Sequence, residues 1–356
     1  MGWRRLGALL LAMVGMASIY LLIWPVSIDP EAWTPPEAPA LTGVYEPNAL
    51  LALVERLGRG AGIGAEDVAI DRSGRIYGGF EDGRVVRLQP DGTQPEMFAE
   101  TGGRPLGMQF DRSGNLVVCD SPRGLISIAP DGTVTVLSTE QGGVAYRFAD
   151  DVDIAADGTV YFSDASSRFD VTQSTADLME HRPNGRLLAY DPGTGTSRLV
   201  VDRLYFANGV ALSPDQSFVL VVETGKYRVR RHWLAGPRQG QTEIFIDNLP
   251  GFPDGISSNG KGIFWLALVS PRKPDVDALL ERPFLRKLIM RLPEAMIPAA
   301  ENYGFVLGLD GSGRVVHNLQ DPAASFALIS SVEEHDGKLY LGSLVEDAIG
   351  RVPVPI

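Results

Sequence analysis

A short sequence pattern recurs six times along this chain, and it constrains the fold more than any other feature. Each copy has a polar head, an alternating apolar segment, a turn rich in Asp, Ser and Gly, and a second apolar segment. The copies cover residues 66–77, 107–118, 151–162, 208–219, 254–265 and 329–341. Period-two alternation interrupted by Gly-containing turns is typical of β-hairpins. The pattern repeats roughly every 40 to 60 residues, and further strands follow the hairpin in a repeat. This repetition predicts an all-β fold, and specifically a six-bladed β-propeller.

The two ends of the chain are expected to meet in the last blade. After Ile329 there is room for only three strands, whereas a blade needs four. We expect the missing outer strand to come from Leu51–Leu57, so that the ring closes between the two ends. Such closure leaves no free sheet edge in the ring.

Charge and cysteine content limit the classes of function. The formal net charge of −12 disfavours a nucleic-acid partner, which would need a basic face. The single cysteine, Cys119, excludes an internal disulfide and lies in an apolar strand, so a buried thiol is expected.

The first residues predict a membrane anchor followed by a linker. Leu6–Val26 has no charged residue and would span roughly 30 Å as a helix, enough to cross a bilayer. Arg4 and Arg5 before it predict a cytoplasmic N-terminus and a propeller on the non-cytoplasmic side. A cleaved signal peptide is the alternative for residues 1–26. Residues 27–45, rich in Pro and Ala, are typical of a linker, which leaves the propeller at 46–356.

The chain contains no Asn-x-Ser/Thr sequon, which favours a bacterial periplasm over a glycosylating lumen.

Two connections are unusually long and should lie on the same face as the polar heads. They cover about residues 165–185 and 270–302, and residues 276–292 within the second have apolar positions at helical spacing with basic residues between them. Long loops in compact domains are usually functional, so both are expected above the mouth of the channel. A structural insertion that shields a blade edge, or a helix that rests on a membrane surface, remain alternatives.

Four of the heads carry oxygen ligands at equivalent places in the repeat: Glu66, Asp150, Asn208 and Asp254. Side chains of this kind that converge on one axis predict a site for Ca²⁺, although Mg²⁺ and Mn²⁺ also take oxygen ligands. Three neighbouring carboxylates repel one another unless a cation is bound or one is protonated. The alternative is a set of turn-capping Asp and Asn residues.

At this point a family resemblance is visible. Residues 206–215 and 251–256 resemble the ligand-bearing motifs of the calcium-dependent phosphotriesterase-like propellers, the superfamily of gluconolactonases, paraoxonases and strictosidine synthases. The resemblance covers about residues 45–354. Residues 281–284 and 334–343 are similar to the strictosidine synthase-like branch that includes adipocyte plasma-membrane-associated protein.

The resemblance implies roles for the four heads. Glu66, Asn208 and Asp254 match metal-ligand positions, and Asp150 stands where the family pattern usually has Asn. Asp254 is also implied as the catalytic base or nucleophile.

Three positions bear on the reaction. Ser330 stands where strictosidine synthase has an essential Glu, and Leu106 stands where paraoxonase has a catalytic His. His181 lies in a long upper loop and is the histidine best placed to reach a substrate.

The resulting hypothesis is a membrane-tethered, calcium-dependent hydrolase of small lactones or aryl esters. The alternatives are a non-catalytic binding propeller with a structural calcium and a strictosidine synthase-like lyase. The expected partners are a small ester or lactone and the membrane.

Overall fold

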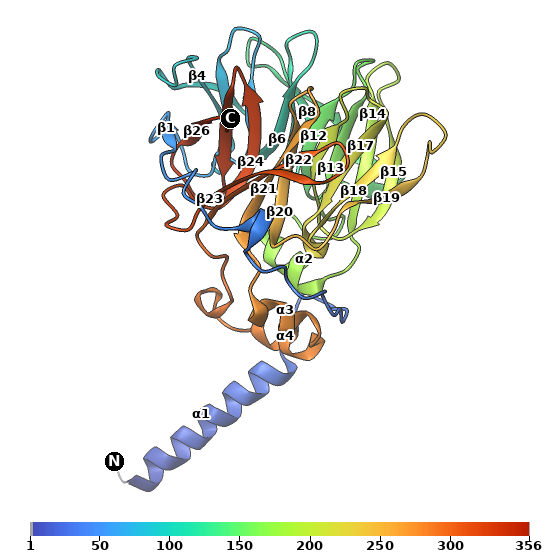
Figure 1. The fold of residues 1–356 in the computed structure, drawn as a ribbon. Coiled ribbons are helices and arrows are strands. Elements are labelled where there is room, and N and C mark those ends of the chain that lie inside the picture. Colours follow the sequence, from blue (N-terminus) through green and yellow to red (C-terminus); the bar gives the residue numbers. More distant parts are fainter. Residues whose placement is uncertain (1–2, 356) are drawn as a thin grey trace.

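The computed structural model describes residues 3–355, and its strands form six four-stranded antiparallel sheets arranged in a ring (Figure 1). The predicted all-β, six-bladed propeller is therefore confirmed. One apolar helix, α1 (Trp3–Ile23), projects from it (Figure 1). Residues 1–2 of the expected anchor (1–26) and residue 356 of the expected propeller (46–356) lie outside the described residues.

Each blade has its first strand nearest the axis, and blade 6 takes its outermost strand from the N-terminal side. Blade 1 contains β2 (Val68–Ile70), β3 (Ile76–Gly79), β4 (Arg84–Leu88) and β5 (Glu96–Glu100). Blade 2 contains β6 (Arg104–Phe110), β7 (Leu116–Ser121), β8 (Gly124–Ile128) and β9 (Val134–Ser138). Blade 3 contains β12 (Ala149–Ile154), β13 (Val160–Asp164), β14 (Gly185–Asp191) and β15 (Thr196–Leu204). Blade 4 contains β16 (Ala207–Leu212), β17 (Phe218–Glu223), β18 (Arg228–Trp233) and β19 (Thr242–Ile246). Blade 5 contains β20 (Gly251–Ser258), β21 (Ile263–Pro271), β22 (Gly304–Asp310) and β23 (Val315–Asp321). Blade 6 contains β24 (Ile329–His335), β25 (Lys338–Ser343), β26 (Ile349–Pro353) and β1 (Glu55–Leu57). A separate hairpin is formed by β10 (Glu140–Gln141) and β11 (Val144–Ala145).

The turn within the repeat is built by its Asp and Gly. In blade 1, Asp71 Oδ1 accepts hydrogen bonds from the backbone N–H of Ser73 at 2.9 Å and of Arg75 at 3.0 Å. Gly74 between them has φ of 80°, a conformation that a residue without Cβ adopts at little cost. The Asp side chain therefore replaces the backbone partners that the turn lacks, which explains why the motif recurs.

The hydrophobic core lies mainly between neighbouring blades. One cluster combines Tyr77 and Val85 of blade 1 with Met108 and Ile126 of blade 2, and each is at most 5% exposed. Cys119 on β7 is fully buried, as expected from its apolar strand. Because each blade buries its faces against two neighbours, the ring is one cooperative unit.

The predicted closure by both chain ends is confirmed. Strand β1 pairs antiparallel with β26, with Glu55 opposite Arg351 and Leu57 opposite Ile349. Arg351 also binds the carboxylate of Glu55 through two nitrogens, each at 2.9 Å.

Two long connections form a cap at one end of the propeller (Figure 1). Here "cap" denotes residues 166–184, with helix α2 (Ser174–Glu180), together with residues 272–300, with α3 (Pro274–Leu280) and α4 (Pro283–Ile289). The helical run expected over 276–292 is thus two helices, because Pro283 lacks an N–H and instead starts α4. The short 3₁₀ helices are η1 (Gly43–Tyr45), η2 (Val171–Gln173), η3 (Thr224–Lys226) and η4 (Glu294–Met296).

Helix α1 is long and apolar enough to cross a membrane by length and composition. The segment after it, residues 24–37, runs across the cap and is called the strap below. Its backbone is bound there: Glu31 N donates to Glu180 O and Trp33 N to Leu280 O, both at 3.0 Å. Part of the expected linker is therefore packed against the propeller's cap.

Candidate metal centre and active site

One position in each blade is directed toward the capped end of the channel. The six equivalent residues are Glu66, Leu106, Asp150, Asn208, Asp254 and Ser330. In blades 2 to 6 the pairing of the inner strand with the second strand shifts register at this position. A β-bulge re-aims the side chain that it carries, so the bulges account for the departure of these side chains from the sheet.

The residue after each head faces the neighbouring inner strand at close range. A Cβ on Gly209 would overlap Ile256 N and Asp254 O of the next blade, which leaves room for glycine only. Where this residue is Asp, its carboxylate binds the next blade instead. Asp67 accepts from Met108 N at 2.8 Å and Asp151 from Val210 N at 2.6 Å.

All four predicted ligands, Glu66, Asp150, Asn208 and Asp254, line one cavity of about 340 Å³ between the propeller and the cap. Each is at most 7% exposed. The side-chain amide of Asn208 donates to Asp254 Oδ1. The structure therefore brings the four oxygen-bearing heads to the floor of a single cavity.

Burial and mutual repulsion shift the protonation of the carboxyls. Burial raises the pKa of Glu66 well above its ordinary value, and the charges of Asp150 and Asp254 add to the rise. The pKa of Asp150 is raised well above its ordinary value first by burial and then by the charge of Asp254. Burial raises the pKa of Asp254 to about 7, against the hydrogen bond from Asn208. A bound cation would relieve the cost of ionising these groups.

The donor set fits a hard divalent cation in its chemistry. Three carboxylates and one amide are oxygen ligands of the kind that Ca²⁺ takes. Asp150 Oδ2 is buried and has no hydrogen-bond partner within the described part of the chain, so it is free to bind a cation. Among residues 3–355, however, no three His, Cys, Asp or Glu side chains are grouped tightly enough to form a metal site by themselves. The site would therefore depend on Asn208 and on the carboxylates drawing closer around the ion.

Arg104 is a site residue that the sequence did not single out. It lines the same cavity, and its Nη2 donates to Gly64 O at 3.0 Å while its Nη1 is buried without a partner in the described residues. Its charge lowers the pKa of Glu66, although burial is the larger effect on that carboxyl. Arg104 comes two residues before Leu106, the equivalent position in blade 2, which has no metal-binding side chain. The sequence around Arg104 therefore gives no signal of a site, and only the fold places it beside the carboxylates.

His181, expected near a substrate, also lines the cavity. Its ring stacks on Trp33 of the strap, with 4.6 Å between centroids and 10° between planes. Burial, followed by the charges of Lys226 and Arg286, lowers its pKa to about 3, so the imidazole is neutral. Its Nε2 is buried without a partner among the described residues, which leaves one hydrogen-bonding atom available to a bound molecule.

The walls above the polar floor are largely apolar. They are formed by propeller and cap residues, namely Leu106, Phe148, Phe206, Phe252, Leu178, Met179, Val276 and Leu280. A cavity with apolar walls and a few convergent polar groups at one end is typical of small-molecule sites.

Known proteins resemble this chain over most of its length. Adipocyte plasma membrane-associated protein of Bos taurus is 35% identical over 348 residues, which cover 91% of this chain and 84% of the relative. Protein STRICTOSIDINE SYNTHASE-LIKE 13 of Arabidopsis thaliana is 34% identical, over 82% of this chain and 78% of the relative. The family description "Strictosidine synthase" matches residues 150–237, and "Strictosidine synthase-like, N-terminal" matches residues 43–88.

The chain therefore belongs to the strictosidine synthase-like family of six-bladed propellers. Within this family, the relatives named adipocyte plasma membrane-associated protein match along nearly the whole chain; that of Rattus norvegicus is 34% identical over 97% of both chains.

Solved structures share the fold at low sequence identity. A gluconolactonase of Xanthomonas campestris has a TM-score of 0.63 at 18% identity and covers 91% of this chain and 99% of its own. The calcium-binding protein regucalcin of Agrobacterium tumefaciens has a TM-score of 0.59 at 14% identity, over 83% and 93%.

Proposed function

We propose that this protein is a calcium-dependent hydrolase of small lactones or aryl esters. One observation carries the proposal: three carboxylates and an amide at equivalent blade positions form the floor of an apolar cavity of about 340 Å³. Glu66, Asp150, Asn208 and Asp254 would hold the cation. Two proteins that share the fold, a gluconolactonase and the calcium-binding protein regucalcin, support this choice.

When bound, calcium would supply a positive charge that polarises an ester or lactone carbonyl. The chain's own residues then have separate tasks. Asn208 orients Asp254 through its amide hydrogen bond, and Asp254 takes a proton from the attacking water or attacks the carbonyl itself. The apolar walls, including Phe148 and Phe206, hold the acyl or aryl group and exclude bulk water.

Two observations favour hydrolysis over the alternatives. Ser330, at the place of the synthase Glu, donates its hydroxyl to Glu66 O at 2.6 Å and offers no acid or base for a condensation. The cavity beneath the cap is open, whereas a purely structural cation would need no such space.

We further propose that α1 anchors the protein and that the propeller lies on the non-cytoplasmic side. Helix α1 has the length and composition to span a bilayer, and Arg4 and Arg5 precede its apolar run. The relatives' name, "plasma membrane-associated", points the same way. A protease that acts on one side of sealed vesicles tests the orientation: cleavage of the propeller from the cytoplasmic side would overturn it.

The test of the activity is hydrolysis of phenyl acetate and a panel of lactones by the full chain, with calcium and after chelation. We expect turnover that needs the metal and that falls by at least about a hundredfold in Asp254→Asn. The matched control is Asp153→Asn, because Asp153 is a half-buried inner-strand carboxyl that accepts hydrogen bonds from Ile154 N and Leu212 N and does not line this cavity.

If Asp254→Asn hydrolysed these substrates as fast as the parent chain, the assignment of the reaction to this site would be wrong. If neither variant nor parent turned over any substrate while calcium raised the melting temperature, the protein would be a binding propeller.

A further inference from the structure

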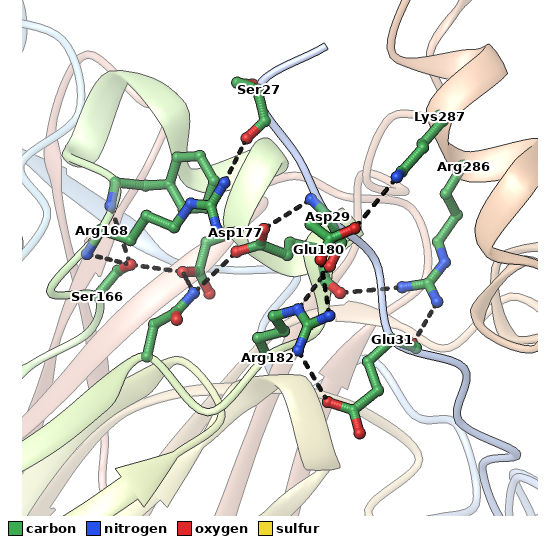
Figure 2. Close-up of polar contacts among 12 residues, drawn as sticks. Ser27, Asp29, Glu31, Ser166, Arg168, Asp177, Glu180, Arg182, Arg286 and Lys287 are labelled. Atoms are coloured by element: carbon green, nitrogen blue, oxygen red, sulfur yellow. Dashed lines mark hydrogen bonds and ion pairs between the residues drawn. The ribbon is translucent and has the colours of Figure 1, made fainter.

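The strap is bound to the cap along its whole length, so it does not act as a flexible tether. Figure 2 shows its central part, where Asp29 N donates to Glu180 Oε1 at 2.7 Å and Arg168 Nη2 donates to Ser27 O at 2.7 Å. Toward the propeller, Arg272 Nη2 donates to Pro36 O at 2.7 Å.

Arg286 joins the strap to both halves of the cap (Figure 2). Its guanidinium is fully buried and donates to Met179 O at 2.7 Å, to Leu280 O at 3.0 Å and to Glu31 O. These acceptors belong to α2, to α3 and to the strap, respectively. Strap and cap therefore move as one body.

No free chain separates α1 from this body. Helix α1 ends at Ile23, and the carbonyl of the next residue, Trp24, already accepts from Arg291 Nε just beyond α4 at 2.6 Å. Consecutive Cα atoms are about 3.8 Å apart, so the cap cannot leave the end of the helix. In Figure 1, α4 lies between α3 and the C-terminal end of α1. If α1 crosses a bilayer, the cap lies at its surface.

The exposed face of the cap has the character of a membrane-surface contact. Phe284 on α4 is 56% exposed and Met296 is 63% exposed, and Trp24, whose carbonyl binds Arg291, is 59% exposed. Residues 270–302 contain six basic and five acidic residues, so their charges nearly balance. This surface is therefore suited to apolar contact at the level of the lipid headgroups, and not to electrostatic attraction to anionic lipid.

We propose that the cap is a lipid-contacting surface: Phe284 and Met296 rest in the interface of the membrane that α1 crosses, and the capped end of the cavity faces that membrane. The partner is the phospholipid bilayer itself. This orientation does not require the site to be catalytic, so its test is independent of any hydrolase assay.

The test uses the full chain in phosphatidylcholine nanodiscs with a polarity-sensitive fluorophore on one introduced cysteine. Phe284→Cys and Met296→Cys report on the cap, and Lys261→Cys, in the exposed β20–β21 turn, is the matched control. The native Cys119 is fully buried, and the labelled parent chain corrects for any reaction there. Quenching by lipids brominated near the headgroup gives the distance from the interface.

We expect quenching at residues 284 and 296 to exceed that at 261 several-fold, with the same order in discs that contain phosphatidylserine. Equal quenching at all three positions would overturn the proposal. Quenching at the cap that appears only with phosphatidylserine would also overturn it, because the contact would then depend on charge. Two cap positions are used because one variant could have a folding defect, which a lowered melting temperature would reveal. The other variant would then still test the proposal.

Discussion

At the scale of single residues, the buried Arg286 of the cap remains charged, whereas burial disfavours the charged form of the carboxyls on the cavity floor. Among the described residues Arg286 has no carboxylate partner; it donates hydrogen bonds to backbone carbonyls, and these bonds from a charged donor offset the cost of its burial. Burial lowers its pKa to about 10, which leaves it charged at neutral pH.

Arg286→Met should therefore destabilise the cap. The change removes the hydrogen bonds from Arg286 to the carbonyls of Met179, Leu280 and Glu31, although the Leu280 carbonyl keeps its bond from Trp33 N; we expect a cost on the order of 3 kcal/mol. We expect faster limited proteolysis within residues 272–300. Arg282→Met is the control, because Arg282 is exposed on the same segment; equal protease resistance of the two variants would contradict the role given to Arg286.

The heads of the inner strands could be predicted from the sequence because they repeat. Glu66, Asp150, Asn208 and Asp254 follow from one pattern and one topology, since equivalent positions in a propeller face the same axis. Arg104 and Trp33 reach the same region from outside that pattern. No local sequence pattern identifies these two residues, because only the closed ring and the packed strap bring them close to the candidate site.

At the scale of elements, composition misleads about the strap. Its Pro and Ala content is typical of a linker, yet many of its contacts use backbone N–H and C=O groups, which every sequence has. Side chains add to these contacts. Asp29 pairs with Arg182 and Lys287 of the cap. Trp33 stacks on His181 and lies 4.0 Å from the Lys226 ammonium, measured to the ring centroid. Asp29 and Trp33 together fix the register of the strap on the cap.

Trp33→Ala should loosen the cap without unfolding the propeller. Loss of the stacking and of the cation–π contact removes on the order of 2 kcal/mol from local stability. We expect amide hydrogen exchange in α2 and α3 to accelerate by about tenfold or more, with the blades unchanged. Val44→Ala, an exposed site in η1, is the control. Unchanged exchange in α2 would show that the strap does not hold the cap.

At the scale of the whole molecule, the pairing of β1 with β26 makes the N-terminal segment part of the ring. The strand count predicted this closure, because three strands after Ile329 cannot complete a blade. The sequence could not show how tightly Leu57 is held: it is 4% exposed and packs with the core of blade 1.

Leu57→Ala should destabilise the entire propeller by about 2–4 kcal/mol, since a buried leucine is truncated at the closure. Leu53→Ala, four residues earlier, is the matched control, because Leu53 is 92% exposed and its loss should change stability by less than about 0.5 kcal/mol. Chemical denaturation measures both. Equal effects would mean that β1 is not needed for closure.

Two acids outside the predicted metal-ligand set, Asp153 and Asp177, predict how stability varies with pH. Burial raises the pKa of Asp153 and of Asp177 to about 6 each, so the folded protein holds more protons than the unfolded chain, whose Asp pKa is near 3.8. The free energy of unfolding should therefore fall as pH rises from about 4 toward 7, and level off above that range. One such group accounts for up to about 3 kcal/mol.

Asp153→Asn should make this decline shallower between about pH 4 and pH 7, the range bounded by its unfolded and folded pKa values. Asp310→Asn should not, because hydrogen bonds lower the pKa of Asp310 and that carboxyl is already ionised throughout the range. Thermal denaturation in the presence of a chelator measures the slope, and an unchanged slope in Asp153→Asn would contradict the assignment.

The closure has a consequence for biosynthesis. Strand β26 is the last of the described strands along the chain, whereas its partner β1 is made soon after α1. The ring can close only after Pro353 has been made, so β1 waits unpaired while the five other blades are produced. A stop codon placed just before β26 should therefore be nearly as damaging as one in the middle of the gene, and newly made chains need protection of an open edge until β26 pairs with β1.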